Sequence, residues 1–182
     1  MQTLPDYLQS DLDIVFVGIN PGAYSAKLGL YFATARNRFW PALNHSGIIL
    51  SGHDLGPGDE ARMNRVGVGF TDVVKRPSSS ASSLRAADYR QDAPTLKANL
   101  LKYQPLVVCF NGLTAYKNYL RYAEGTKVSP ALGAQERRIG TSRIFVVPSS
   151  SPANAAYSLE VLADWYVRLG EYRDRTKIQR NG

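Results

Sequence analysis

The sequence predicts an α/β domain built around a mainly parallel sheet. Short apolar runs rich in β-branched residues alternate along the chain with longer segments that carry apolar residues at helical spacing. Strands joined by crossover helices produce this alternation. The length of 182 residues fits a single domain, over residues 1–182, that can bury one full core.

The first expected strand covers residues 14–17 and ends in turn-forming residues. Gly18, Asn20, Pro21 and Gly22 follow the apolar run directly. In an open α/β sheet, ligands bind beyond the carboxyl ends of the strands, so the carboxamide of Asn20 would lie in that crevice. Pro21 biases Asn20 toward an extended backbone, which would aim the side chain. An ordinary strand and turn is the alternative interpretation.

The other elements follow from the same patterns. Apolar residues at helical spacing predict a helix that Asn37 caps and Gly47 ends. A strand over 66–72 is rich enough in glycine to allow close approach of the backbone. The remaining expected elements are a short helix over 59–65, a helix over 86–103 that Pro94 can interrupt, a strand over 106–110, a helix over 113–122, a strand pair or one long strand over 138–147, and a helix from 157 to about 172.

The charge of the chain favours a polyanionic partner. The net charge is +7 and the isoelectric point is about 9.6. Basic residues gather near the C-terminal end, at Arg168, Arg173, Arg175, Lys177 and Arg180. Residues 173–182 are therefore either a segment that contacts phosphates or a frayed, solvated end.

Few residues are suited to metal or redox chemistry. The sequence has one cysteine, Cys109, and a single cysteine excludes a disulfide framework and a cysteine-ligated cluster. Cys109 lies in an apolar expected strand, so we expect a buried, inert thiol. His45 and His53 stand without ligand spacing, so we expect no metal and no cofactor. No apolar run is long enough to span a membrane, and residues 1–13 lack the pattern of a secretory signal. We expect a cytoplasmic protein, nucleoid-associated if bacterial, that is not secreted.

The common nucleotide-binding and hydrolase motifs fail on spacing. A dinucleotide-binding loop that begins at Gly67 would need a glycine where Asp72 stands. No Gly-Lys-Ser/Thr follows a strand, and no serine lies in a Gly-x-Ser-x-Gly elbow. Three polar loops remain after apolar strands, at 18–22, 71–76 and 148–155. At one edge of a sheet, these loops would form a single pocket.

Five ordered blocks carry a resemblance to a known family. They are Gly18-Ile19-Asn20-Pro21-Gly22, Asn37-Arg38-Phe39-Trp40, Gly69-Phe70-Thr71-Asp72, Tyr103-Gln104-Pro105 with Phe110-Asn111-Gly112, and Pro148-Ser149-Ser150-Ser151. Over roughly residues 14–170 the chain resembles the mismatch-specific uracil/thymine-DNA glycosylases. The resemblance implies a three-layer α/β/α sandwich, base flipping, and excision of uracil, often from G:U mispairs. The cysteine content fits, because the related iron–sulfur glycosylases need several cysteines.

The resemblance also implies roles for residues of the first loop. Asn20 matches the asparagine that positions the attacking water, and Gly18 and Ile19 belong to the same base-binding loop. Because uracil leaves as a delocalised, fairly stable anion, a held water and donors on the base matter more than a strong acid. Phe32 matches the aromatic residue that stacks on the flipped base. The alternatives are that Tyr31 takes this role, or that Phe32 is a core residue.

Asp72 departs from the lysine or asparagine that family members carry at its position. A carboxylate can accept the proton of the attacking water and favour an oxocarbenium-like transition state, so we assign Asp72 a catalytic role. The alternative is a helix cap or an ion-pair partner of Lys75 or Arg76.

The last block corresponds to the family segment that enters the duplex and binds the lesion strand. Hydroxyls and backbone amides suit phosphate contacts, so the expected DNA-binding residues are Ser149, Ser150, Ser151, Ala153 and Asn154. The family usually has a bulky wedge where this chain has Ala153, and alanine does not fill the space that a flipped base leaves. Asn154 or a residue of another loop would then serve. A serine-rich surface turn is the alternative interpretation.

From these features we expect a monofunctional DNA glycosylase that acts as a monomer on double-stranded DNA containing uracil mispairs and initiates base-excision repair. No lysine is marked as a Schiff-base nucleophile, so strand cleavage is not expected. Two alternatives stay open. One is a non-catalytic nucleic-acid-binding module on the same fold, and the other is a glycosylase for another base, such as thymine or hypoxanthine; fold alone does not separate them.

Overall fold

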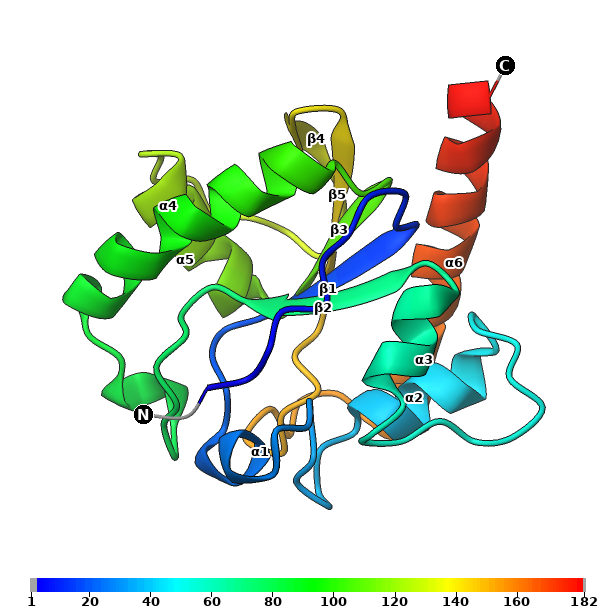
Figure 1. The fold of residues 1–182 in the computed structure, drawn as a ribbon, viewed down its shortest axis with the longest axis horizontal. Helices are drawn as coiled ribbons and strands as arrows, with labels where there is room; N and C mark the ends of the chain where they lie inside the picture. Colours follow the sequence, from blue (N-terminus) through cyan, green and yellow to red (C-terminus); the bar gives the residue numbers. More distant parts are fainter. Residues whose placement is uncertain (1–2, 182) are drawn as a thin grey trace.

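A five-stranded sheet forms the centre of the computed structural model, which describes residues 3–181 (Figure 1). The strands stand in the order β2-β1-β3-β5-β4. Their bounds are β1 Ile14–Gly18, β2 Val68–Asp72, β3 Val107–Asn111, β4 Gly133–Ile139 and β5 Ser142–Val147. The first four strands of this order are parallel, and the edge strand β4 pairs antiparallel with β5.

Helices cover both faces of the sheet, which confirms the three-layer α/β/α architecture. Figure 1 shows α4 and α5 on one side and α2, α3 and α6 on the other. The helices are α1 Ala23–Leu28, α2 Phe39–Ser46, α3 Glu60–Arg65, α4 Ala86–Tyr103, α5 Leu113–Ala123 and α6 Leu159–Asn181, with a 3₁₀ turn at Ala81–Ser83.

Strand β1 is buried on both faces of the sheet, which explains why its sequence is apolar throughout. Ile14 and Phe16 belong to the core beneath α2 and α6, whereas Val15 and Val17 belong to the core beneath α4 and α5. Successive side chains of a strand point to opposite faces, and both faces are dry here. A continuous apolar run is therefore the pattern that this central strand requires.

Helix α4 runs through Pro94 without a break, contrary to the interruption considered from the sequence. Pro94 lies on the exposed side, between the buried residues Ala93 and Leu96. Packing of these two residues against the sheet offsets the backbone hydrogen bond that proline removes. The helix ends at Tyr103, with Gln104 in the left-handed conformation.

Strand β4 begins five residues before the expected strand pair, at Gly133. Its middle residues are largely exposed and polar, and its register with β5 shifts between Gln135 and Arg138. An edge strand with a bulge and a solvated middle carries no apolar pattern, so its first half could not be predicted from the sequence.

Helix α6 continues to Asn181, so residues 173–181 of the segment expected as a possible frayed end are helical, and residue 182 lies outside the described residues. The Lys177 ammonium pairs with Asp13 at 2.8 Å, and Arg173 donates to the Ile48 carbonyl at 3.2 Å. These contacts, together with the buried Thr176, hold the last turns against the domain. None of the helices within residues 3–181 has the length and hydrophobicity needed to cross a membrane.

Residues 3–7 extend the sheet at its β2 edge. Tyr7 and Phe70 form an antiparallel bridge, with N–H···O distances of 2.9 and 3.2 Å. Asp6 accepts from the Thr71 hydroxyl at 2.7 Å and pairs with the Lys75 ammonium. This segment covers an otherwise open strand edge and carries Leu4 to the mouth of a pocket described below.

At Gly69 the N-terminal segment lies close against β2. A Cβ at residue 69 would lie 2.4 Å from the Tyr7 carbonyl oxygen and 2.7 Å from Leu12 Cδ1. We expect Gly69→Ala to lower the free energy of unfolding by about 1–3 kcal/mol through overpacking, measured by urea denaturation. Gly56→Ala is the control, because a Cβ there meets nothing within 4 Å. Equal stability of the two variants would contradict this account.

Candidate active site

A cavity of 370 Å³ lies beyond the carboxyl ends of the parallel strands. It gathers the three loops that follow β1, β2 and β5. Ten of the eleven residues expected at the site line it, and Asn154, which follows Ala153 in sequence, is not part of the lining; the ten are Gly18, Ile19, Asn20, Tyr31, Phe32, Asp72, Ser149, Ser150, Ser151 and Ala153. The parallel strand order thus forms the single pocket that the sequence predicted.

A larger and more open hollow of 660 Å³ lies beside this cavity, between α2 and residues 54–57. The two share Phe32, Thr34 and Asn37. Neither Asn20 nor Asp72 reaches the larger hollow. The smaller cavity is therefore the candidate active site, because it holds the groups suited to catalysis.

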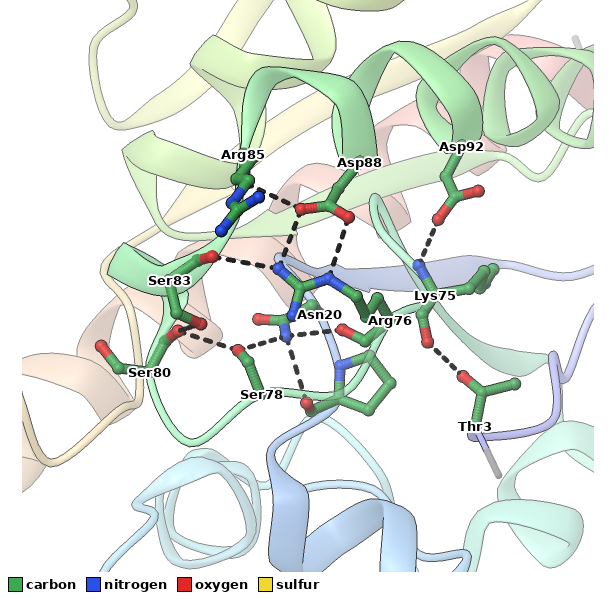
Figure 2. A network of polar contacts seen from close by, with 11 residues as sticks. Thr3, Asn20, Lys75, Arg76, Ser78, Ser80, Ser83, Arg85, Asp88 and Asp92 are labelled. Atoms are coloured by element: carbon green, nitrogen blue, oxygen red, sulfur yellow. Dashed lines mark hydrogen bonds and ion pairs between the residues drawn. The ribbon is translucent and has the colours of Figure 1, made fainter. Parts of the chain in front are cut away.

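The carboxamide of Asn20 is held in one orientation. Its Nδ2 donates to the Arg76 carbonyl at 2.9 Å, to the Ser78 hydroxyl at 2.8 Å and to the Pro21 carbonyl at 3.2 Å (Figure 2). Carbonyl oxygens only accept hydrogen bonds, so the nitrogen must face them. Within residues 3–181 nothing donates to Asn20 Oδ1, which leaves one aimed acceptor on a pocket wall.

A second layer of charged groups supports Asn20. Arg76 donates through Nε and Nη2 to the two oxygens of Asp88, both at 2.9 Å, and through Nη2 to the Ser83 carbonyl. Figure 2 shows this pair directly above Asn20. The hydrogen bonds from Arg76 and the Arg85 amide lower the pKa of Asp88 to about 2. The carbonyl that orients Asn20 is thus itself fixed by an ion pair and by α4.

Asp72 is a buried carboxyl group that forms no ion pair with any of residues 3–181. It ends β2, stands in register with Gly18, and is 3% exposed. Its Oδ2 is buried and has no hydrogen-bond partner within residues 3–181. Burial raises the pKa of Asp72 to about 7; nearby Asp6 adds to the rise, and Lys75 opposes it.

Both alternatives for Asp72 are wrong. Asp72 ends strand β2, and the next helical turn begins only at Ala81, so Asp72 caps no helix. Lys75 pairs with Asp6, and Arg76 pairs with Asp88, so the two cations that follow Asp72 in sequence are held elsewhere. Gly18 makes room for the carboxylate, because a Cβ at residue 18 would lie 2.3 Å from Asp72 Oδ1. Gly18 therefore shapes the pocket by admitting Asp72 against the backbone of β1.

The structure separates the two aromatic candidates for base stacking. Tyr31 is a core residue: it is 2% exposed, and its hydroxyl donates to the Pro5 carbonyl at 3.1 Å. Phe32 is half-buried, and one ring face stacks on Phe39 with centroids 4.0 Å apart and planes 17° apart. Its φ of +52° is a strained value for a non-glycine residue, and such strain gathers at functional sites.

The loop after β5 is less exposed than expected for a row of phosphate ligands. Ser150 is fully buried: its hydroxyl accepts from Asn111 Nδ2 at 3.0 Å, and its N–H donates to Asn111 Oδ1 at 3.1 Å. Ser150 is thus a support of the loop and no free phosphate ligand. The Asn154 amide folds back onto the Ser149 carbonyl at 3.0 Å and does not project as a wedge. Ala153 is exposed.

Three pocket or loop residues were not assigned from the sequence. Asn111 ends β3 as an asparagine directly after an apolar run, a signal that the sequence does contain. Leu4 reaches the cavity from the N-terminal segment, for which no local pattern exists. Arg38 donates through Nη2 to the carbonyls of Ser151 and Asn154. Neither Leu4 nor Arg38 would be found without the tertiary contacts.

The residues described offer no ligand set for a metal. Within residues 3–181 no group of three or more His, Cys, Asp or Glu side chains lies close enough together to hold an ion. Cys109 is buried in β3, and burial raises its pKa, so its thiol is unreactive.

Comparison with known proteins gives three matches. The family model of the uracil DNA glycosylase superfamily matches residues 5–169. The G/U mismatch-specific uracil DNA glycosylase of Schizosaccharomyces pombe is 31% identical over 163 residues, which are 88% of this chain and 50% of that protein. The chain thus spans about half the length of that relative. The NMR structure of a candidate uracil DNA glycosylase from Methanosarcina acetivorans superposes with a TM-score of 0.59 at 24% identity, covering 93% of this chain and 98% of that one, which shows a shared fold.

Phe32 provides a test of how the pocket holds an aromatic ligand. We expect Phe32→Ala to weaken capture of a flipped base by about 1–3 kcal/mol, the value of one stacking contact, measured as excision rate at subsaturating enzyme. Phe39→Ala is the control, because Phe39 is fully buried in the core and should lose about 3–5 kcal/mol of stability. A loss of stability in Phe32→Ala as large as in the control would make Phe32 a core residue.

Proposed function

The chain belongs to the uracil DNA glycosylase superfamily, and on that premise we propose that it is a monofunctional glycosylase that excises uracil from mismatched duplex DNA, above all from G:U pairs. The name of the Schizosaccharomyces pombe relative supports this substrate. One observation carries the chemistry: an oriented Asn20 carboxamide and a buried, unpaired Asp72 carboxyl line the same cavity. A pocket that binds nucleic acid without reacting has no need of a costly buried carboxyl.

The two groups divide the work of hydrolysis. Asn20 Oδ1 accepts a hydrogen bond from a water and aims it at the anomeric carbon of the flipped nucleotide. An amide cannot take a proton at neutral pH, so Asp72 serves as the base that receives it. The water oxygen bonds to the sugar, the glycosidic bond breaks, and its electrons leave with the uracil anion. The negative charge of Asp72 also favours the oxocarbenium-like sugar.

Water is the proposed nucleophile because the cavity offers no amine. No lysine is present among the residues that line it in the described chain. The product is therefore an intact strand with an abasic site. Phe32 stacks against the extruded base, and the amide groups around Gly18 and Ile19 meet its polar edge.

The activity is tested directly on defined duplexes. Wild-type protein is incubated with duplexes that carry uracil opposite guanine or adenine, with single-stranded uracil DNA, and with thymine or hypoxanthine opposite guanine. Alkali then reveals abasic sites as breaks. We expect cleavage after alkali only, with U:G the best substrate. Binding without any abasic product would favour a non-catalytic module, and a preference for T:G or hypoxanthine would reassign the base.

Asn20→Ala tests the held water. Loss of an oriented polar group should lower the single-turnover excision rate by about 10²–10³-fold, while binding to an uncleavable lesion duplex persists. Asn118→Ala, which removes an amide from the far side of the domain on α5, should leave the rate unchanged. A near-normal rate for Asn20→Ala would remove the asparagine from the mechanism.

Asp72→Asn tests the base. The wild-type rate should rise with pH through about 7, where the Asp72 carboxyl ionises, and fall below it. The variant should lose about 10²-fold or more in rate, and its acid limb should flatten. Asp164→Asn, at an exposed site on α6, is the control. A wild-type rate that falls as the pH rises through 7 would mean that the protonated carboxyl is the active form.

Asp72 also links pH to stability. Its folded-state pKa lies above the value of an unfolded aspartate, so the stability it contributes is complete at low pH and is lost as the pH rises through about 7. Asp72→Asn, which stays neutral, should therefore gain melting temperature over wild type well above pH 7 and not at acid pH. If the difference in melting temperature between Asp72→Asn and wild type stays the same from acid pH to well above pH 7, Asp72 is not buried as a neutral acid.

A further inference from the structure

The guanidinium of Arg38 is enclosed by residues 149–157, which we call the lesion loop. Nη2 donates to the Ser151 carbonyl at 2.9 Å and to the Asn154 carbonyl at 2.7 Å, and Nη1 donates to the Tyr157 carbonyl. The Arg38 N–H also donates to the Ser150 carbonyl at 3.1 Å. One residue that precedes α2 thus binds four carbonyls of a loop more than 100 positions away.

Besides Arg38, the lesion loop is held mainly through residues 149–154: the Asn154 side chain donates to the Ser149 carbonyl, its N–H donates to the Ser151 carbonyl, and Ser150 is bound to Asn111. The loop contains no helix or strand, and its exposed residues 152, 153, 155 and 156 are proline and alanines without polar side chains. Three carbonyls converging on one point repel one another unless a donor with a fixed fork of N–H groups lies between them. Only a guanidinium presents such a fork, whereas a lysine ammonium would satisfy these carbonyls poorly.

The charge of Arg38 is not neutralised within the domain. None of the ion pairs formed by residues 3–181 includes Arg38. Backbone carbonyls orient the cation but leave its full positive charge under the loop. That charge adds attraction for a phosphate bound on the outer side of the loop.

Two adjacent residues, Arg38 and Phe39, connect the lesion loop to the Phe32 ring, which is the proposed base-stacking ring. Arg38 holds the loop, and the next residue, Phe39, stacks beneath Phe32. Ser150, which accepts from the Arg38 N–H, is in turn bound to Asn111 at the end of β3. The segment 38–39 therefore sets the spacing between the loop that meets the DNA strand and the ring that meets the flipped base.

We propose that Arg38 is a positioning residue that holds the lesion loop ready to receive the DNA strand, so that its loss impairs capture of the lesion more than the chemical step. The proposal rests on the proposed glycosylase function. It assigns to Arg38 no contact with the base or the water. Its effect on the reaction passes through the carbonyls of Ser151, Asn154 and Tyr157.

The first experiment separates capture from chemistry. Single-turnover excision of a U:G duplex is measured over a range of enzyme concentrations for wild type, Arg38→Lys and Arg38→Gln. We expect Arg38→Gln to raise the half-saturating concentration about 10–100-fold, as for lost charge-assisted hydrogen bonds, while the rate at saturation falls less than about tenfold. Arg38→Lys should recover only a small part of this loss. A fall in the saturating rate at unchanged half-saturation would overturn the proposal.

The control removes a cation that lies away from the pocket. Lys97 on α4 pairs with Glu124 at 3.0 Å. Lys97→Gln should keep the wild-type half-saturating concentration within about twofold, since it has no part in the lesion loop. An equal loss in Lys97→Gln would mean that general stability or net charge accounts for the effect.

The second experiment needs no activity, so it stays decisive if the enzyme acts on another base or on none. Hydrogen exchange is followed at the amides of residues 151 and 153–157 in the free protein. We expect Arg38→Gln, or Arg38→Lys if the former fails to fold, to speed exchange there about tenfold or more, with α4 and α5 unchanged. Wild-type protection of the loop in a folded variant would overturn the proposal. Failure of the wild type to release uracil, with the loop effect intact, would reject the proposed function alone.

Discussion

The in-register parallel pairing of β1 with β2 is the constraint on which the site depends. It sets Gly18 beside Asp72 at the ends of neighbouring strands, two residues before Asn20. Side chains alternate between faces along a strand, so a slip of one residue would turn Asp72 away from Gly18 and from the cavity. The dry cores on both faces hold the register, because each strand buries a defined set of side chains on each side. The same packing therefore stabilises the sheet and fixes the geometry of the site.

The local arrangement of charges keeps Asp72 free at an energetic cost. Lys75 and Arg76 follow it closely in sequence, and either would lower its pKa and occupy its oxygens if paired with it. Asp6 holds the Lys75 ammonium, and Asp88 holds the Arg76 guanidinium. An unpaired buried carboxyl destabilises the fold. Its raised pKa puts a base in reach of neutral pH, which is the usual trade between stability and activity at a catalytic site.

Each part of the site is held by a segment distant in sequence. The Arg76 carbonyl orients Asn20, the Pro5 carbonyl holds Tyr31, and Arg38 holds the loop after β5. These three anchors lie outside the helices and strands, so preorganisation comes from cross-links between loops rather than from any single element. Phe32, whose backbone is strained, is also held from a distant part of the site. Its ring stacks on Phe39, which belongs to the segment that carries Arg38.

The sequence by itself determined the alternation of strands and helices, the loops that form the pocket, and the asparagine and aspartate that line it. Those features follow from periodicity and turn chemistry, which act between neighbours in the chain. Only the tertiary structure decided that Phe32 is the more exposed of the two rings in the cavity wall while Tyr31 is a core residue, that Ser150 is buried, and that Lys75 and Arg76 pair with carboxylates other than that of Asp72. It also revealed the exposed half of β4 and the full length of α6. Ion-pair choice, ring exposure and edge pairing depend on which distant segments come within a few ångströms of each other, and a local pattern carries no record of that distance.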